Sequence, residues 1–244
     1  MEGKGKMTLV MEPIGVIRSC FKEKFGIPRQ AGLVQTALAR IVLFAPFGRD
    51  ESLKDLEMFS HIWVQFYFHG ASDEGWKSTV RPPGLGGRQR VGVFASRSPH
   101  RPNHIGLSAV RLLDIDPGGD GASLLVGGGD FLDGSPVLDI KPYLVYSDCI
   151  GYADPGYATA ARDRIDVVFS KQADDFCVAY RRAKKLDLRG LIIETLRQDP
   201  RPASQKNREK IFGIRLWGVN VRWLAQPGVF TVMECSDLED GGMS

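Results

Sequence analysis

Short apolar stretches alternate with glycine- and proline-rich turns from Ile14 to about Tyr152, without intervening long helices. The clearest of them is His61 to His69, in which Ile62, Val64, Phe66 and Phe68 fall on one side of an extended chain and His61, Trp63, Gln65, Tyr67 and His69 on the other. Many short strands at this spacing predict a mainly β fold, a closed or nearly closed β-barrel. The further predicted strands are Leu38 to Phe44, Arg90 to Ala95, Ala109 to Ile115, Ser123 to Val126 and Val137 to Ile140.

The pattern changes in the loose segment from Gly151 to Ala161, which predicts a boundary between a barrel domain at residues 1–155 and a small α+β domain at residues 162–244. The second domain is about the minimum size for independent stability, so we expect it to pack on the barrel or on a second subunit. Its predicted helices are Ala173 to Lys185 and Asp187 to Arg197. Its predicted strands are Ile165 to Phe169, Phe212 to Trp217, Asn220 to Leu224 and Val229 to Met233.

Positive charge is concentrated in two regions of a chain whose formal net charge is only +3. Gly75 to Leu113 contains seven Lys or Arg and no acid, and Arg181 to Arg215 contains eleven Lys or Arg against four acids. Asp114 to Ile140, in contrast, contains six acids and no Lys or Arg. Two separated basic surfaces favour contact with one polyanion at two places. The structural alternatives are a basic loop beside acidic turns and a solvated helix face.

Several classes of protein are disfavoured by the sequence. The longest apolar run, Ile41 to Phe47, is far below the roughly 20 residues of a membrane-spanning helix, and Met1 to Glu12 lacks the apolar centre of a signal peptide. These features predict a cytoplasmic protein with no membrane partner. The four cysteines are far apart, which argues against a zinc site or a disulfide framework. The glycine fingerprints of Rossmann and P-loop nucleotide sites are missing from the sequence.

The loop from Ala95 to Ser108 is the first candidate site. Two prolines, Pro99 and Pro102, stiffen it, and Arg97 and Arg101 offer planar guanidinium groups suited to a carboxylate or a phosphate. We interpret it as a preorganised anion-binding loop; the alternative is a stiff connection whose arginines pair with acids such as Asp130 or Asp133. The same prolines prevent the regular helix that would place the rings of His100 and His104 on one face, so no metal site is predicted.

An aspartate-rich turn follows, in which Asp130 and Asp133 flank Phe131 and Leu132. The two carboxylates suit ribose hydroxyls or an ammonium group, while Phe131 and Leu132 would contact a flat base. A base of a single-stranded loop stacked on an aromatic side chain such as Phe131 is the RNA geometry that we expect. Asp139 and Lys141, two positions apart on a predicted strand, point to the same side and are alternatively a salt-bridged pair.

Long motifs extend this pattern across nearly the whole chain, from about Ile14 to Trp223. They are Ile14-Gly15-Val16-Ile17-Arg18-Ser19, Pro28-Arg29-Gln30, the loop from Ala95 to Ser108, the run from Asp133 to Tyr143, and Asn220-Val221-Arg222-Trp223. Together they resemble the TsaA-like (TrmO-type) family, whose characterised members are tRNA (N6-threonylcarbamoyladenosine) methyltransferases. The resemblance implies a β-barrel, non-Rossmann methyltransferase that uses S-adenosylmethionine and forms homodimers with a small C-terminal domain beside the barrel.

The resemblance also implies which residues form the sites, and the small domain would help to hold the anticodon arm of the tRNA. The residues assigned to the cofactor are Pro28, Arg29, Gln30, His69, Gly70, Arg97, Leu107, Asp130, Phe131, Leu132 and Asp133. The residues assigned to the tRNA are Arg101, Lys141, Arg201 and Arg222. The chain departs from the family pattern at His104, Ser135 and Ser204, where Pro, Thr and Tyr are usual.

The implied reaction is methylation of N6 of threonylcarbamoyladenosine next to the anticodon. Methyl transfer from a sulfonium is an in-line displacement in which positioning matters most, and a base that removes the N6 proton would add about 10² to 10⁴ fold. Asp133, Asp139 and Tyr143 are, in that order, the candidate bases. Either Arg97 or Arg101 would bind the carboxylate of the cofactor or of the substrate. The alternatives are a noncatalytic RNA-binding module and a methyltransferase that acts on a small molecule.

Overall fold

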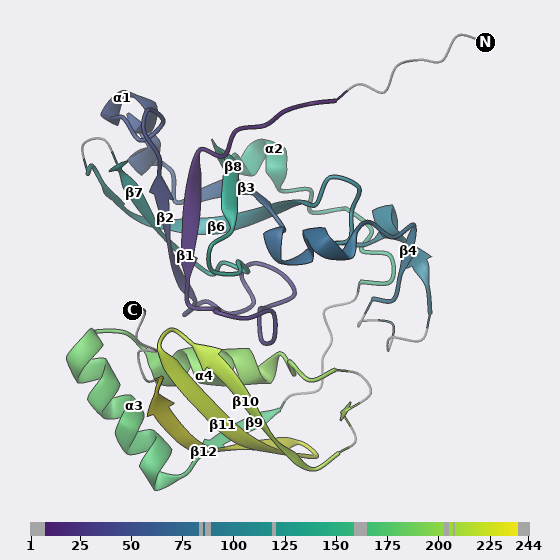
Figure 1. Ribbon diagram of the computed structural model, residues 1–244, viewed down its shortest axis with the longest axis vertical. Helices are drawn as coiled ribbons and strands as arrows, with labels where there is room; N and C mark the ends of the chain where they lie inside the picture. Colours follow the sequence, from purple (N-terminus) through teal and green to yellow (C-terminus); the bar gives the residue numbers. More distant parts are fainter. Residues whose placement is uncertain are drawn as a thin grey trace.

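The computed structural model describes residues 8–82, 85, 89–118, 121–158, 165–202, 205–206 and 208–238. Six antiparallel strands close a barrel in the order β1-β2-β7-β6-β3-β8, which confirms the predicted mainly β, closed-barrel architecture (Figure 1). The strands are β1 (Gly15–Ser19), β2 (Leu38–Leu43), β3 (His61–Tyr67), β6 (Ile105–Asp116), β7 (Ser123–Gly127) and β8 (Pro136–Pro142). The short helices beside them are α1 (Asp50–Leu53) and α2 (Val145–Asp148), with 3-10 turns at Leu56–Met58 and His69–Glu74.

The barrel interior is filled by apolar side chains from one face of each strand. In β3 the alternation predicted from sequence holds, because Ile62, Val64 and Phe66 are buried while the residues between them are more exposed. Phe66 lies opposite Gly106 of β6, where a Cβ atom would come within 2.4 Å of the Phe66 ring. The missing side chain at Gly106 therefore makes room for the ring, which packs edge-on against Phe131 at a centroid distance of 5.0 Å.

The predicted strand from Arg90 to Ala95 is much shorter than expected. Only β5 (Val91–Gly92) forms, paired with β4 (Thr79–Val80), and the chain then enters a 3-10 turn at Val93–Ala95. In this antiparallel pair Thr79 faces Gly92, so Phe94 and Ala95 would have to pair with the residues before Ser78, where the Lys77 N–H instead donates to the His100 carbonyl at 3.1 Å. The β4 segment lies at the right-hand edge of Figure 1, apart from the barrel strands.

A second sheet lies below the barrel in Figure 1, with strand order β10-β11-β12-β9. The helices α3 and α4 follow β9, as predicted, and each begins at a side-chain cap: Ser170 accepts from the Ala173 N–H and Asp187 from the Gly190 N–H. The elements are β9 (Asp166–Phe169), α3 (Lys171–Lys184), α4 (Leu188–Arg197), β10 (Lys210–Leu216), β11 (Val219–Gln226) and β12 (Val229–Asp237). No helix among the described residues is long and apolar enough to cross a bilayer.

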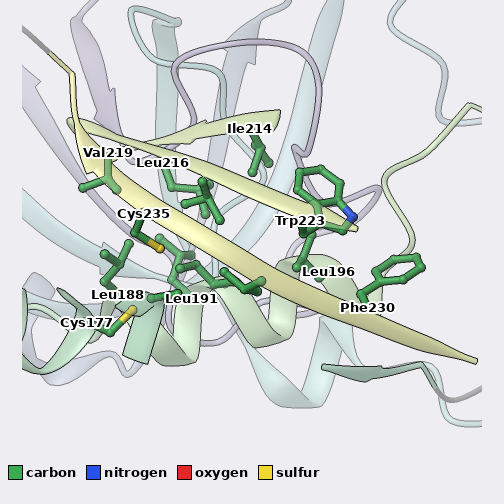
Figure 2. Close-up of a cluster of buried hydrophobic side chains, with 14 of the residues drawn as sticks. Cys177, Leu188, Leu191, Leu196, Ile214, Leu216, Val219, Trp223, Phe230 and Cys235 are labelled. Atoms are coloured by element: carbon green, nitrogen blue, oxygen red, sulfur yellow. The ribbon is translucent and has the colours of Figure 1, made fainter. Parts of the chain in front are cut away.

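The core of this second unit forms between α4 and the sheet. Leu191 and Leu196 project from α4 toward the strands that carry Trp223 and Phe230 (Figure 2), and all four side chains are fully buried. Trp223 stacks between Phe212 at 5.6 Å and Phe25 at 6.0 Å, measured between ring centroids. Because Phe25 belongs to the loop between β1 and β2, the core extends beyond the second sheet.

The loop between β1 and β2 connects the two units. Phe21 and Val34 of this loop are fully buried in the core of the second unit. The Trp217 N–H donates to the Cys20 carbonyl at 2.8 Å, and the Thr36 hydroxyl donates to the Glu194 carboxylate at 2.7 Å. The second unit therefore packs against the β1–β2 loop of its own barrel. Packing on the barrel was one of the two arrangements expected from the sequence, the other being packing on a second subunit.

Candidate functional site

A cavity of about 120 Å³ opens on the outer face of the β3–β6 strand pair. Three segments distant in sequence meet there. They are the β1–β2 loop, the loop from Ala95 to Ser108 (the arginine loop), and the aspartate-rich turn after β7. The two candidate segments of the sequence therefore share one cavity. Its lining residues are Gln30, Ala31, Trp63, Arg97, Leu107, Ser108, Ala109 and Asp130.

Asp130 is the only carboxylate among these lining residues. The Ser108 hydroxyl donates to its Oδ1 at 2.6 Å, which fixes the side chain between β6 and the turn. Burial raises the pKa of Asp130, while the Ser108 hydrogen bond and the positive charge of Arg97 act in the opposite direction. A partly exposed carboxyl with a raised pKa is suited to accept a proton from a group bound in the cavity.

Arg97 connects two of the three segments. Its guanidinium donates to the side-chain oxygen of Gln30, and the side chain remains exposed. This contact differs from the sequence-based alternative in which the arginines pair with Asp130 or Asp133. A guanidinium carries five N–H donors in a planar array, so most of them remain able to bind a carboxylate or phosphate at the cavity.

Trp63 forms one wall of the cavity and is held from behind. Its indole N–H donates to the Asp148 carboxylate at 2.8 Å, and Tyr143 packs against it at a centroid distance of 5.5 Å. Sequence reasoning missed Ala31, Trp63 and Ala109 as site residues, and it included Ser108 only as the last residue of the candidate loop. The available signal was the β3 alternation, which places Trp63 on the face opposite the barrel core.

Asp133 anchors the aspartate-rich turn instead of lining the cavity. Its carboxylate accepts the Ser19 N–H at 2.7 Å and pairs with Lys22 at 3.0 Å. Gly70 lies against the same turn, because a Cβ there would come within 2.8 Å of the Leu132 side chain. His69 lies nearby with its Nδ1 buried and without a hydrogen-bond partner among the described residues. These predicted cofactor residues thus adjoin the turn, although they do not line the cavity.

Phe131, the example given for an aromatic that stacks on a base, cannot have this role. Its ring is fully buried in the barrel core, edge-on to Phe66, so no planar ligand can reach its face. Only its backbone can contact a ligand. Of the other predicted cofactor residues, Pro28 is buried and Arg29 half-buried next to Gln30, while Leu107 is 54% exposed on the outer face of β6.

The remaining candidate bases lie outside the cavity lining. Asp139 forms an ion pair with Lys141 at 2.8 Å, which confirms the salt bridge considered as the alternative from the sequence. Tyr143 touches the cavity only through Trp63. Their assignment as bases stays a prediction, whereas the geometry favours Asp130 over both.

The arginines assigned to the tRNA have intramolecular partners. Arg101 donates to the Ser96 carbonyl at 2.7 Å and so braces the arginine loop. Arg201 is buried, 2.8 Å from Asp199 and over the Phe230 ring, and a phosphate could reach it only if that pair opened. Arg222 pairs with Glu234 at 3.0 Å on the surface. Ser204, one of the departures from the family pattern, lies outside the described residues.

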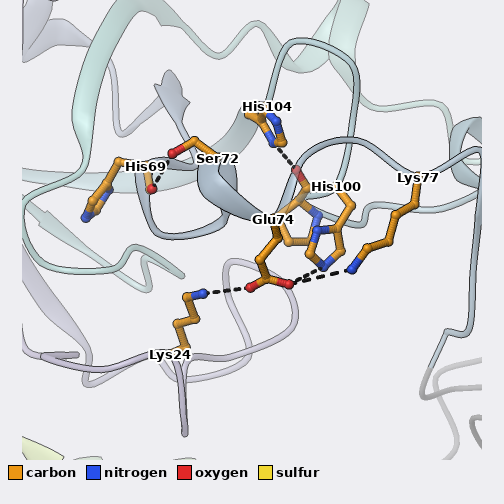
Figure 3. A network of polar contacts seen from close by, with 8 residues as sticks. Lys24, His69, Ser72, Glu74, Lys77, His100 and His104 are labelled. Carbon is orange, nitrogen blue, oxygen red and sulfur yellow. Dashed lines mark hydrogen bonds and ion pairs between the residues drawn. The ribbon is translucent and has the colours of Figure 1, made fainter.

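A polar network holds the base of the arginine loop (Figure 3). The Glu74 carboxylate lies 2.9 Å from Lys24, 3.6 Å from Lys77 and 3.7 Å from His100. The hydrogen bond from Lys24, followed by the charges of Lys24 and His100, lowers the pKa of Glu74. The network joins the β1–β2 loop to Lys77, near the start of the basic segment, and to His100 of the arginine loop. Within the described residues, no group of three or more His, Cys, Asp or Glu is placed to hold a metal ion.

Comparison with known proteins gives matches over both units. Residues 16–149 match the tRNA-methyltransferase O N-terminal domain family, and residues 162–238 match the TrmO C-terminal domain family. The chain is 43% identical over 225 residues to the tRNA (adenine(37)-N6)-methyltransferase of Escherichia coli, covering 91% of this chain and 95% of that protein. It is 44% identical over 230 residues to a putative S-adenosylmethionine-dependent methyltransferase of Pseudomonas aeruginosa, RcsF, covering 93% and 98% respectively.

A solved structure agrees with these matches. The crystal structure of TrmO from Pseudomonas aeruginosa superposes with a TM-score of 0.78 at 39% identity, covering 94% of this chain and 100% of that chain.

Proposed function

The chain belongs to the tRNA-methyltransferase O family, and on this premise we propose that it transfers a methyl group from S-adenosylmethionine to N6 of threonylcarbamoyladenosine next to the anticodon of tRNA. The names of two of its relatives support a methyl donor and an adenine at position 37. The observation that carries the proposal is the cavity where the Arg97 loop and the Asp130 turn meet. It combines a cation, a carboxylate and apolar walls at one place.

The lining fits part of the proposed donor. A volume of about 120 Å³ is smaller than the roughly 300 to 1,000 Å³ of a complete small-molecule site, so the cavity would take one portion of the molecule. Arg97 would bind a carboxylate, and Trp63 and Leu107 would contact an apolar or flat portion. The buried Nδ1 of His69, which has no partner among the residues that the structure describes, offers a further polar contact beside the turn. When bound, S-adenosylmethionine supplies an electrophilic methyl group on a sulfonium.

Asp130 would act as the base for the N6 proton. The acceptor nitrogen is a weak nucleophile until it loses that proton, because its lone pair is shared with the ring and the carbonyl group. Asp133 is less suited, since a backbone N–H and Lys22 already occupy its oxygens. Ser108 would orient the Asp130 carboxylate, and Arg97 would hold the charged group of a ligand in register with it.

The domain division at residues 1–155 and 162–244 remains our proposal, supported by the separate barrel and four-stranded sheet. We also propose a homodimer. Four apolar or aromatic side chains of one short segment, Val145, Tyr146, Ile150 and Tyr152, are 56% to 94% exposed next to the Asp148 that holds Trp63. Such a patch favours a protein partner, and a second copy there would enlarge the small cavity.

Light scattering is expected to give twice the chain mass, and Tyr152→Asp should shift the protein toward monomer. A wild-type monomer at micromolar concentration would contradict the dimer while leaving the proposed reaction intact.

Two measurements separate the proposed reaction from its alternatives. Calorimetry with S-adenosylmethionine should detect binding, and no binding at millimolar concentration would leave a noncatalytic RNA-binding module. Mass spectrometry of nucleosides from tRNA incubated with the protein and donor should show one added methyl on threonylcarbamoyladenosine. Donor turnover without that gain would favour a small-molecule acceptor. A cytoplasmic location stays a prediction.

Arg97→Ala is expected to weaken binding of donor or tRNA by about 1.5 to 3 kcal/mol, the range for a hydrogen bond to a charged group. This corresponds to a rise in Kd of roughly 10- to 150-fold. Calorimetry with the donor and a separate titration with tRNA assign the lost contact to one ligand. The exposed Arg49→Ala is the matched control, and unchanged affinity of Arg97→Ala for both ligands would make Arg97 structural.

A further inference from the structure

An exposed aromatic and basic arm lies next to the cavity. We define the aromatic arm as residues 75–82, 85 and 89–101, the described parts of the segment that forms β4, β5 and the first half of the arginine loop. It carries Trp76, which is 58% exposed, and Phe94, which is 76% exposed. The arm contains no Asp or Glu.

Backbone hydrogen bonds bring the two aromatic positions into neighbouring segments. Thr79 pairs with Gly92, the Val93 N–H donates to the Ser78 carbonyl at 3.0 Å, and the Lys77 N–H donates to the His100 carbonyl at 3.1 Å. The two chain segments that contain Trp76 and Phe94 therefore run side by side. Arg97, three residues after Phe94, lines the cavity, so the arm continues directly into the candidate site.

The turn that presents Phe94 is firmly held. Val93 is buried, the Ser96 N–H donates to the Val93 carbonyl at 3.2 Å, and Arg101 donates to the Ser96 carbonyl at 2.7 Å. The Arg101 guanidinium lies 5.8 Å from the centroid of the Phe94 ring. A large apolar ring is thus kept in solvent beside a cation, although burying it would be favourable.

The charge around the ring selects the partner. Arg90 donates to the Thr79 hydroxyl and has no acidic partner among the described residues. Glu74, the acid at the base of the arm, is already paired with Lys24 and Lys77 and lies 3.7 Å from His100. Aromatic rings interleaved with unpaired cations are the arrangement that binds single-stranded nucleic acid, because bases stack on the rings while phosphates meet the cations.

We propose that the aromatic arm binds unpaired nucleotides next to the target adenine, with Phe94 and Trp76 as stacking surfaces for bases. Arg90 and Arg101 supply positive charge for the adjoining phosphates. The inference rests on the proposed function for the identity of the RNA, a tRNA anticodon loop. It assigns to exposed rings the stacking that the buried Phe131 cannot perform.

Fluorescence anisotropy tests the proposal with two RNA probes and no methyl donor: a stem–loop with an unpaired loop and a fully paired duplex of the same length. Phe94→Ala is expected to weaken stem–loop binding about tenfold, the loss of one base–aromatic stack. Duplex binding should stay unchanged, because paired bases expose no ring face. Phe94→Trp should restore the affinity, and the exposed Phe44→Ala serves as the matched control.

Each outcome decides the proposal. Equal weakening on both probes would overturn it, since general electrostatic or structural damage does not distinguish loop from duplex. Unchanged stem–loop affinity in Phe94→Ala would also overturn it, and a loss of dimer mass in that variant would reassign the ring to contact with a second copy of the chain. If the wild type methylates threonylcarbamoyladenosine while Phe94 has no effect, this inference fails alone. Loop-specific dependence on Phe94 without methylation would instead count against the proposed reaction.

Discussion

Asp130→Asn is expected to lower the rate of methyl transfer by about 10² to 10⁴ fold, the contribution of a well-placed base. Asparagine keeps the shape of the side chain and can still accept the 2.6 Å hydrogen bond from Ser108. It cannot take up the N6 proton. The donor and tRNA should therefore bind nearly as well as to the wild type, and the loss should appear in kcat.

The same substitution is expected to stabilise the fold at neutral pH. Burial raises the pKa of Asp130 in the folded chain, so its contribution to stability is fully present below the unfolded pKa and is lost as pH rises through the folded pKa. Asparagine removes this loss. Thermal unfolding should show a higher Tm for Asp130→Asn at neutral pH and no gain well below the unfolded pKa of an aspartate.

Comparison variants make the assignment of the base decisive. Asp116→Asn, an exposed carboxylate on β6, is the control and should leave kcat unchanged. A large loss of kcat in Asp139→Asn, with Asp130→Asn nearly as active as the wild type, would identify Asp139 and not Asp130 as the base. A fall in both kcat and Tm for Asp130→Asn would indicate damage to the turn rather than loss of a base.

Trp223→Ala is expected to lower the free energy of unfolding by about 3 to 5 kcal/mol, the usual cost of removing a fully buried large aromatic side chain. The ring contacts Phe212 of its own sheet and Phe25 of the β1–β2 loop. Its loss therefore weakens both the second unit and its contact with the loop. Denaturant unfolding monitored by circular dichroism measures the effect.

A second variant separates packing from polarity at this position. The Trp223 Nε1 is buried and has no hydrogen-bond partner in the part of the chain that the structure describes, so Trp223→Phe removes an unsatisfied donor while keeping most of the aromatic contact. It should cost much less than Trp223→Ala. Met58→Ala, at a residue 78% exposed, should change stability by no more than about 0.5 kcal/mol. If Trp223→Ala changed the free energy of unfolding no more than Met58→Ala, contacts other than those of Trp223 would hold the two units together.

The sequence predicted a strand or helix well where the element's own residues show a clear periodicity of apolar side chains. The β3 alternation and the spacing of Leu188, Leu191 and Leu196 in α4 reflect periodicities that burial imposes on a strand and a helix. The segment from Arg90 to Ala95 has apolar residues too, but a strand also needs a partner. Beyond Gly92 that partner is missing, because the Lys77 N–H donates to the His100 carbonyl, and the apolar pattern of Arg90 to Ala95 does not reveal this.

The site was predictable only in part for the same reason. Gln30, Arg97, Leu107 and Asp130, assigned from the family resemblance, do line one cavity. Trp63 and Ala109 join them because the register of β3 against β6 places them opposite each other, and register is a property of the fold. Asp130 and Asp133 look equivalent in the sequence; their difference arises from Lys22 and the Ser19 N–H, which occupy only Asp133.

The β1–β2 loop makes the two units poor candidates for separation. Phe21 and Val34 are packed in the core of the second unit, whereas Gln30 and Ala31, between them in sequence, line the cavity. A chain truncated after residue 155 would retain every barrel strand but would expose those apolar anchors to water. For engineering, the C-terminal unit is thus a scaffold for the cavity wall, and a chimera that exchanges it must exchange the loop as well.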